Sequence, residues 1–209
     1  MENIAIVTVA YNRVKSLSRL LNSLLCADID NAPLIISIDK SNTNEVERYA
    51  NDFIWPYGEK KVITHKENLG LRKHILSIGQ LLDYYDAVIV LEDDIIVAPG
   101  FYKFAVAATK FYCNDNNIAG ISLYNYPFNY QTKHNKLACI NNIYCFKEWG
   151  EKSWLKYHIA YCIDQNKYFV YPYSSYSTNC ADKGTHVTTN LFVFQSPLKW
   201  SKQENTYRF

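Results

Sequence analysis

The sequence has none of the long apolar or basic stretches that mark membrane and nucleic-acid proteins. Its apolar runs stay well short of the ~20 residues that a helix needs to cross a bilayer. A strand-like segment begins at residue 4, without the basic region and longer apolar segment of a secretion signal. Lysine and arginine form no run, and the formal net charge is only +2. We therefore expect no nucleic-acid partner and no transmembrane segment, although peripheral association with a membrane stays open.

Cysteine is also sparse and unpatterned. The six cysteines show no Cys-x-x-Cys spacing and are too few for a disulfide scaffold, so we interpret them as core residues of a cytoplasmic protein. With 48% hydrophobic and 20% charged residues, the 209-residue chain is typical of one globular domain. Aromatic residues are abundant instead, with 18 Tyr and 4 Trp concentrated after residue 100. They suit contacts with a sugar or a nucleoside, and equally a tyrosine-rich edge of the fold.

The first half of the chain alternates strand patterns with helix patterns. The predicted strands comprise residues 4–10, 33–39, 61–65 and 87–91. The predicted helices between them comprise residues 15–26, 45–52 and 75–82. This alternation predicts an α/β fold, a doubly wound and mostly parallel sheet with helices on both faces. Beyond it we expect a helix at 101–112, strands at 118–124, 137–146 and 190–194, a loop at 125–136 and an aromatic helix at 149–161.

Three acids follow directly on the apolar strand at residues 87–91. The five apolar residues predict a strand buried on both faces, in the middle of a parallel sheet. Glu92, Asp93 and Asp94 would then meet at its carboxyl end, where open α/β sheets bind their ligands. Adjacent carboxylates repel one another, and oxygen-only ligands suit Mg²⁺ or Mn²⁺. The alternative is a solvated acidic turn without a ligand.

Four motifs occur in order at the ends of the predicted strands. They are Val-Thr-Val-Ala-Tyr-Asn-Arg at 7–13, Ser-Ile-Asp at 37–39, Asn-Leu-Gly-Leu at 68–71, and Leu-Glu-Asp-Asp at 91–94 with Ala-Pro-Gly-Phe at 98–101. Together they resemble the nucleotide-sugar glycosyltransferases of the A-type fold, in particular family 2. The Glu-Asp-Asp triplet is similar to that of the N-acetylglucosaminyltransferase I type. The resemblance implies one domain over 1–209, with a nucleotide-sugar-binding half at 1–110 and an acceptor-side half at 111–209.

The resemblance implies a donor pocket at the ends of the first two strands. Asp39 would accept a hydrogen bond from uracil or ribose, Tyr11 and Arg13 would line the same pocket, and Arg72 would reach base or phosphate. From the residues alone, Asp39 could instead cap the turn that follows it. Arg72 and His74 could be solvated residues at a helix start, which for His74 is our expectation.

The same resemblance implies a metal site and a diphosphate site. Asp94 would hold the Mn²⁺ or Mg²⁺ that bridges the diphosphate, while Glu92 and Asp93 would contact the donor sugar and ribose. His186 could be a second metal ligand, a phosphate contact or an ordinary loop histidine. The segment 179–186 also resembles a carboxy-terminal loop of related bacterial enzymes.

The implied reaction is an inverting transfer from a nucleoside diphosphate sugar, with a UDP-sugar favoured, to a glycan or lipid-linked acceptor. It would move a hexosyl or N-acetylhexosaminyl group, and its setting would be the assembly of bacterial surface polysaccharide. A carboxylate must remove the acceptor's hydroxyl proton, and Glu148 or, failing that, Glu151 is our expectation for this base. Both glutamates could also be ordinary exposed charges.

Two other functions compete with this interpretation. A sugar-phosphate nucleotidyltransferase has a similar sheet, but residues 11–14 contain none of the glycine expected of a phosphate loop after the first strand. A nucleotide-sugar-binding module without turnover would explain why the segment after Trp149 is short for the family.

Overall fold

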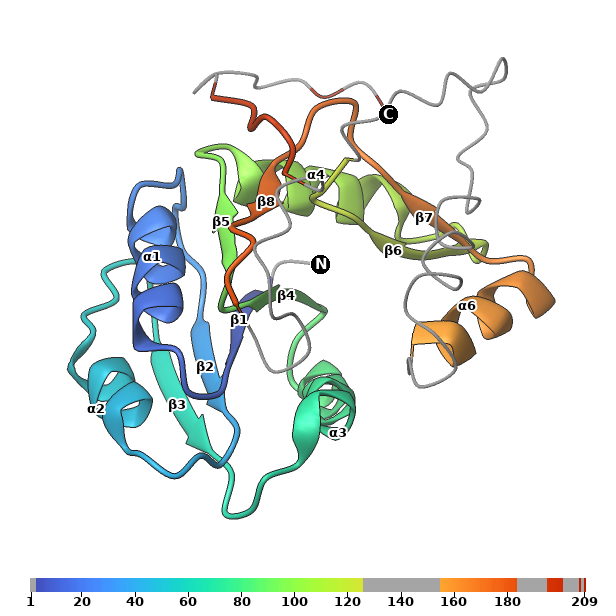
Figure 1. The fold of residues 1–209 in the computed structure, drawn as a ribbon. Helices are drawn as coiled ribbons and strands as arrows, with labels where there is room; N and C mark the ends of the chain where they lie inside the picture. Colours follow the sequence, from blue (N-terminus) through green and yellow to red (C-terminus); the bar gives the residue numbers. More distant parts are fainter. Residues whose placement is uncertain (1–2, 126–154, 184–194, 201–206, 208) are drawn as a thin grey trace.

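A computed structural model describes residues 3–125, 155–183, 195–200, 207 and 209, and the account below concerns these residues. A parallel sheet with helices packed against it forms one side of the molecule, and two smaller strand pairs lie beside it (Figure 1). The strands are β1 (Ile4–Ala10), β2 (Leu34–Ile38), β3 (Lys60–Thr64), β4 (Ala87–Glu92), β5 (Ile95–Val97), β6 (Ile118–Ile121), β7 (Tyr168–Val170) and β8 (Ser177–Asn179). The helices are α1 (Val14–Leu25), α2 (Glu45–Asp52), α3 (Gly70–Ile78), the 3₁₀ turn η1 (Gly79–Asp83), α4 (Phe101–Tyr112) and α6 (Leu155–Asp164).

The main sheet has the strand order β3-β2-β1-β4, and all three pairings are parallel. Parallel neighbours need a crossover segment between them, and the chain supplies α1, α2 and α3 with η1 in these places. The predicted α/β fold with a parallel sheet is therefore confirmed. The predicted bounds of α1 and α2 differ from those of the structure by at most one residue at either end.

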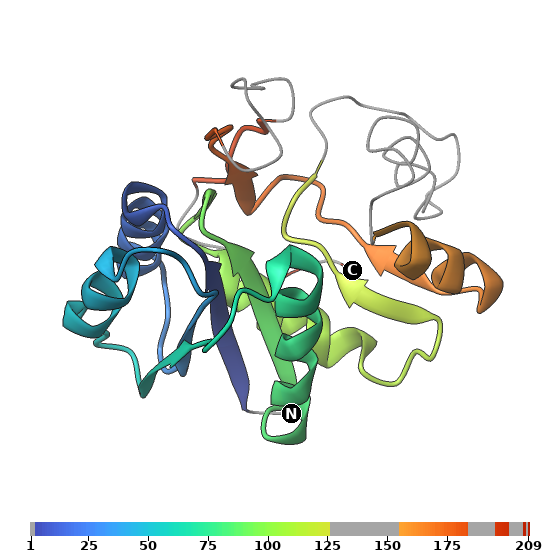
Figure 2. The same ribbon diagram turned by 60° about the horizontal axis from the view of Figure 1, so that its bottom comes forward.

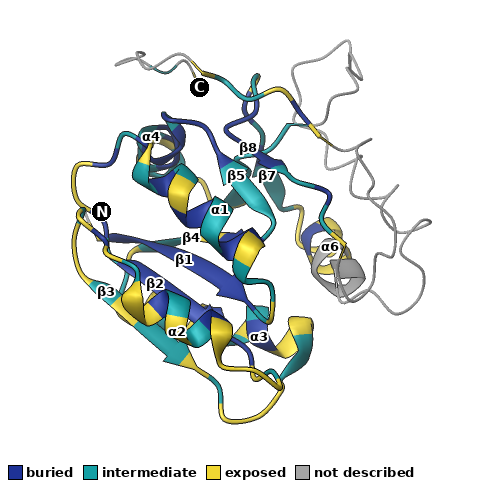
Figure 3. Cartoon of the chain, turned by 60° about the vertical axis from the view of Figure 1, so that its left-hand side comes forward, coloured by how far each residue is buried: buried dark blue, intermediate teal, exposed yellow. Residues whose placement is uncertain are grey.

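Alternate residues of β1 point to opposite faces of the sheet, as the two-residue period of a strand requires. Ile4, Ile6 and Ala10 pack into the larger core with buried side chains of α1, α2 and α4. Ala5, Val7 and Val9 pack into a smaller core with Ile78 of α3. Figure 2 shows the sheet between α3 on one face and α1, α2 and α4 on the other, and Figure 3 shows β1 and β2 buried along their length. The expectation of helices on both faces is thus also confirmed.

The strand before the acids is not the fully buried one, which corrects our prediction. In the described part of the chain, β4 is the edge strand of the four-stranded sheet, next to β1, and Val90 is 40% exposed. All residues of β1 and β2 are buried. An apolar run shows that a strand contacts a core, but it does not show whether a second strand pairs on its far side.

The chain after β4 turns at the acids and enters a second pairing. Its next strand, β5, pairs antiparallel with β8, so that Ile95 faces Asn179 and Val97 faces Ser177. This pairing brings a segment from the carboxy-terminal part of the chain to the acidic end of β4 (Figure 1).

The later elements agree only in part with expectation. The predicted strand at 118–124 is the shorter β6, which pairs in parallel with β7. The expected aromatic helix at 149–161 corresponds to α6, described from Leu155 to Asp164. The expected loop at 125–136 and strands at 137–146 and 190–194 lie outside the described residues, apart from Asn125. No helix in the described part of the chain is long and apolar enough to cross a membrane.

His74 is buried rather than solvated, contrary to expectation. It lies in α3 with 2% of its surface exposed, and its Nε2 is 2.7 Å from the Ser37 hydroxyl of β2. The His65 ring packs edge-on against it with 4.9 Å between ring centroids. Burial, together with the neighbouring His65 ring, lowers the pKa of His74 to about 4.

This lowered pKa makes the stability of the fold depend on pH. The unfolded chain takes up a proton at His74 near its ordinary pKa of 6.5, while the folded chain resists until about 4. We therefore expect the free energy of unfolding to fall as pH drops from 6.5 towards 4, with roughly 1–2 kcal/mol lost by pH 5 through this one group. Urea unfolding at pH 7.5 and 5 should show a smaller pH effect in His74→Gln than in the parent. Equal pH effects in the two proteins would contradict this assignment.

Candidate functional site

The three acids lie where the chain leaves β4, beside the exit of β1. Val9 of β1 is in register with Glu92, so the turn at Asp93 and Asp94 lies next to the segment that follows Ala10. Parallel strands end at the same edge of a sheet, which is why these acids meet Arg13. Asp93 is buried and Asp94 is half-buried.

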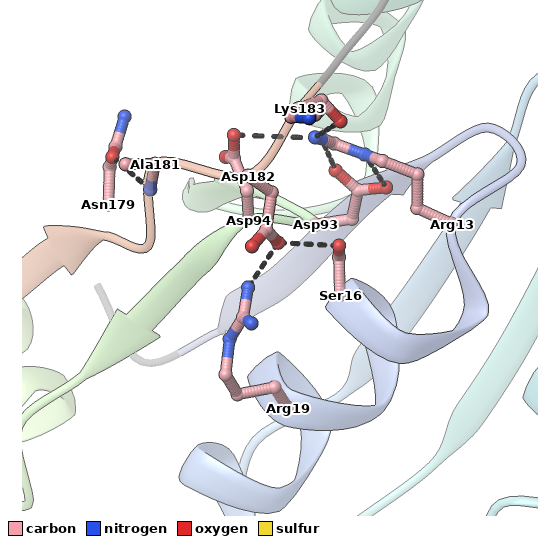
Figure 4. Close-up of polar contacts among 9 residues, drawn as sticks. All are labelled: Arg13, Ser16, Arg19, Asp93, Asp94, Asn179, Ala181, Asp182 and Lys183. Atoms are coloured by element: carbon pink, nitrogen blue, oxygen red, sulfur yellow. Dashed lines mark hydrogen bonds and ion pairs between the residues drawn. The ribbon is translucent and has the colours of Figure 1, made fainter. Parts of the chain in front are cut away.

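Arg13 neutralises part of this acidic turn. Its Nη2 and Nε donate to the two carboxylate oxygens of Asp93, the Nε at 3.2 Å, in a bidentate pair (Figure 4). The same guanidinium lies 3.6 Å from Asp94 Oδ2. Its Nη1 donates to the backbone carbonyl of Lys183 at 3.3 Å. One arginine thus joins the exit of β1, the acidic turn and the carboxy-terminal segment.

Within the described residues, Arg13 compensates the negative charge of these acids only in part. Burial raises the pKa of Asp93, and the guanidinium offsets this effect only in part. The Glu92 side chain reaches solvent, yet desolvation by the surrounding protein, with repulsion from Asp94 and Asp93, raises its pKa to about 7. Carboxylates held in this way favour a further cation, and perturbed acids of this kind gather at functional sites.

A second ion pair, which we did not predict, lies beside the first. Asp182 accepts a hydrogen bond from the Ser16 hydroxyl at 2.6 Å and pairs with the Arg19 guanidinium (Figure 4). The backbone N–H of Cys180 donates to the carbonyl of Asp94 at 2.8 Å. In the sequence Asp182 is one acid in a polar loop, and no spacing or period links it to α1. The resemblance of residues 179–186 to a carboxy-terminal loop was the one signal that pointed to this segment.

Asp39 lies at the end of β2 and closes the turn that leads into α3. Its Oδ1 accepts from the backbone N–H groups of Lys40 and Leu69 at 2.9 and 2.8 Å, and its Oδ2 accepts from Gly70 at 2.9 Å. Gly70 has a φ of +71°, a conformation that glycine adopts without strain. Asp39 is 4% exposed. The sequence left open that Asp39 caps the turn after β2. The structure shows the Lys40 contact of such a cap, together with two contacts at the start of α3 that the sequence did not suggest, and the nucleotide contact stays a prediction.

The predicted residues thus fall into two described groups. Arg13, Asp93 and Asp94 are in contact, and Glu92 directly precedes them. The other group, at the ends of β1 and β2 and the start of α3, comprises Tyr11, which is half-buried, Asp39 and the exposed Arg72. Glu148, Glu151 and His186 lie outside the described residues.

The acidic turn fits a metal ion that arrives with a phosphate ligand. Among the described residues, no three His, Cys, Asp or Glu side chains form a metal-binding cluster. Arg13 binds Asp93, whereas the one ion-pair contact of Asp94 within the described residues is the 3.6 Å contact with the same guanidinium. Mg²⁺ in nucleotide sites commonly uses one or two carboxylates, with water and phosphate oxygens as its other ligands. Asp94 suits this arrangement rather than a cage built wholly of protein.

The chain belongs to glycosyl transferase family 2, because the model of that family matches residues 5–172. The predicted A-type glycosyltransferase fold agrees with this membership and with the parallel sheet. No curated protein matches the chain.

Solved structures with similar folds include S. aureus TarS 1-349 in complex with UDP-GlcNAc, with a TM-score of 0.42 and 20% identity over 57% of this chain and 34% of that one. Another is GalNAc-T7 with UDP, GalNAc and Mn²⁺, with a TM-score of 0.47 and 22% identity over 58% of this chain and 23% of that one. This chain thus covers about a third or less of these proteins.

Breaking the Arg13–Asp93 pair should cost more stability than breaking an exposed pair. Arg13→Met leaves Asp93, whose side chain is 7% exposed, without its partner, so we expect the free energy of unfolding to fall by about 1–3 kcal/mol. Lys103→Met is the matched control, because it breaks an exposed pair. The Lys103 side chain is 37% exposed and that of its partner Asp28 is 45% exposed. The loss in this control should be clearly smaller, because solvent screens an exposed pair. If urea unfolding shows the same loss of free energy of unfolding in both variants, Arg13 stabilises Asp93 no more than Lys103 stabilises Asp28.

Proposed function

We propose that this family 2 protein is a metal-dependent, inverting glycosyltransferase that uses a nucleoside diphosphate sugar, with a UDP-sugar favoured. The observation that carries the proposal is the acidic turn at Asp93 and Asp94, placed at the carboxyl end of a parallel strand beside the exit of β1. Ligands of open α/β sheets bind at such strand ends. Among the residues that the structure describes, one guanidinium pairs with these carboxylates, and carboxylates compensated in part favour a cation together with the diphosphate that it bridges.

The donor would lie across the two described groups of residues. Arg72 is exposed at the start of α3, where it would meet a base or phosphate, and Tyr11 directly follows β1. Asp39 already fixes the start of α3, and its Oδ2 accepts one backbone N–H, which leaves capacity for one more donor, such as the uracil N–H. Glu92 and Asp93 would face the donor sugar and ribose, with Arg13 holding Asp93 in place.

Asp94 is the proposed metal ligand, with His186 as the proposed second one. A bound Mn²⁺ or Mg²⁺ would neutralise the charge that develops on the leaving nucleoside diphosphate. Arg13 keeps Asp93 engaged, so that Asp94 is the carboxylate of the turn left to face that ion.

Our proposal for the acceptor side is based on the sequence alone. We propose a glycan or lipid-linked acceptor, transfer of a hexosyl or N-acetylhexosaminyl group, and Glu148 or Glu151 as the base that takes the acceptor's proton. A cytoplasmic setting, with bacterial surface polysaccharide as the product, is part of the same proposal. Membership of family 2 favours a glycosyltransferase over a nucleotidyltransferase.

The proposal predicts nucleotide binding that depends on metal and on Asp94. Calorimetric titration with UDP and separately GDP, with and without Mn²⁺, should show one nucleotide bound at micromolar affinity only in the presence of the metal. Asp94→Asn should weaken this binding at least tenfold, which is about 1.4 kcal/mol. Asp28→Asn, at an exposed pair beside α4, should bind as the parent does. If neither nucleotide binds under any metal condition, the acidic turn is not a donor site.

A second measurement separates an enzyme from a binding module without turnover. In the enzyme, Glu148→Gln or Glu151→Gln should bind the nucleotide normally and lose most of the transfer to acceptor. A parent protein that binds the nucleotide but transfers sugar to no glycan or lipid-linked acceptor would instead support the binding module.

A further inference from the structure

The segment from Asn179 to Lys183 lies against the acidic turn and is held there at several points. Cys180 N–H donates to the Asp94 carbonyl at 2.8 Å, and the Lys183 carbonyl accepts from Arg13 at 3.3 Å. Between them, Asp182 pairs with Arg19 and accepts from the Ser16 hydroxyl. The 179–183 segment therefore contacts both the acidic turn and α1 (Figure 4).

The backbone of this segment is strained in a way that needs support. Ala181 has a φ of +55°, in the left-handed region that residues with a Cβ seldom adopt. The Asn179 side chain accepts from the Ala181 N–H at 2.7 Å, which fixes the turn from one side. On the other side, Asp182 holds the turn by its contacts with Ser16 and Arg19 of α1. Strained residues persist where the surroundings determine their conformation, and they cluster at functional sites.

One edge of α1 serves both the acidic turn and the segment. Ser16 and Arg19 are three residues apart, so they share a face of the helix, and Arg13 precedes Ser16 by three residues. Arg13 reaches Asp93, while Ser16 and Arg19 reach Asp182. An acid near the first turn of a helix also gains from the helix dipole. Although burial by itself would raise the pKa of Asp182, Arg19 and Ser16 hold that pKa below its usual value.

We propose that Asp182 is a positioning residue of the donor site, which docks the 179–183 segment onto α1 and thereby fixes the acidic turn around Asp94. This inference rests on the proposed function. The mechanical link runs from Asp182 through the backbone of Cys180 to the carbonyl of Asp94, and from Lys183 to Arg13. The affinity for nucleotide and metal should accordingly depend on a side chain that binds neither.

The test combines hydrogen exchange with nucleotide binding in Asp182→Ala and Asp182→Asn. The amides of Cys180 and Ala181 should exchange at least tenfold faster than in the parent, because the segment loses its anchor on α1. The dissociation constant for UDP with Mn²⁺ should rise roughly tenfold in Asp182→Ala and less in Asp182→Asn, which keeps an acceptor for Ser16. The urea midpoint should stay close to that of Asp28→Asn, which loses an ion pair outside both the acidic turn and the 179–183 segment.

A charge exchange tests the pairing itself. Arg19→Asp should weaken UDP binding as Asp182→Ala does, and Arg19→Asp combined with Asp182→Arg should recover part of the affinity and of the slow exchange. A structural role alone would change the urea midpoint without this recovery in the dissociation constant.

The outcomes separate this inference from the proposed function. If the parent binds UDP and the Asp182 variants bind it equally well, the positioning role is wrong while the glycosyltransferase proposal stands. If exchange at Cys180 and Ala181 is unchanged, Asp182 does not anchor the segment and the inference also fails. If the parent binds no nucleotide, the proposed function fails first, and faster exchange in the variants would show only a structural anchor.

Discussion

The candidate site depends on one constraint, which is that the carboxylates following β4 need positively charged partners. Asp93 is buried, and a buried carboxylate needs a partner because desolvation penalises its charge. Arg13 supplies that partner from the exit of β1, and the geometry of a bidentate guanidinium fixes both residues at once. The same guanidinium lies near Asp94 and reaches Lys183, so a single side chain sets the relation of three segments.

The parallel sheet is what makes this meeting possible. The register of β4 against β1 brings Glu92 beside Val9, and the turn after each strand then opens on the same side. The pairing of β5 with β8 adds a segment from the far end of the chain, and Asp182 ties that segment to α1. The sheet therefore does more than stabilise the fold. Its register also fixes the relative positions of the strand ends that form the candidate site.

Asp39 and His74 show how the partners of a side chain can differ from those that its place in the sequence suggests. Asp39 does follow the second strand, as predicted, but its carboxylate accepts hydrogen bonds from the backbone N–H groups of Leu69 and Gly70. His74 follows a polar segment and looks solvated in sequence, yet the turn of α3 points it at Ser37 beneath the helix. In both cases the deciding partner lies about 30 or more residues away in the chain.

The sequence by itself determined the alternation of strands and helices, the parallel sheet and the gathering of acids at a strand end, because period and composition are local properties. It also placed Asp93 and Asp94 at the carboxyl end of a parallel strand, while Arg13 was indicated only by the resemblance to family 2. Only the tertiary structure decided that β4 borders the described sheet, that Arg13 pairs with Asp93, and that Asp182 meets Arg19 from 163 positions away. Such contacts depend on which loop reaches which strand end, and no local pattern of residues encodes that choice.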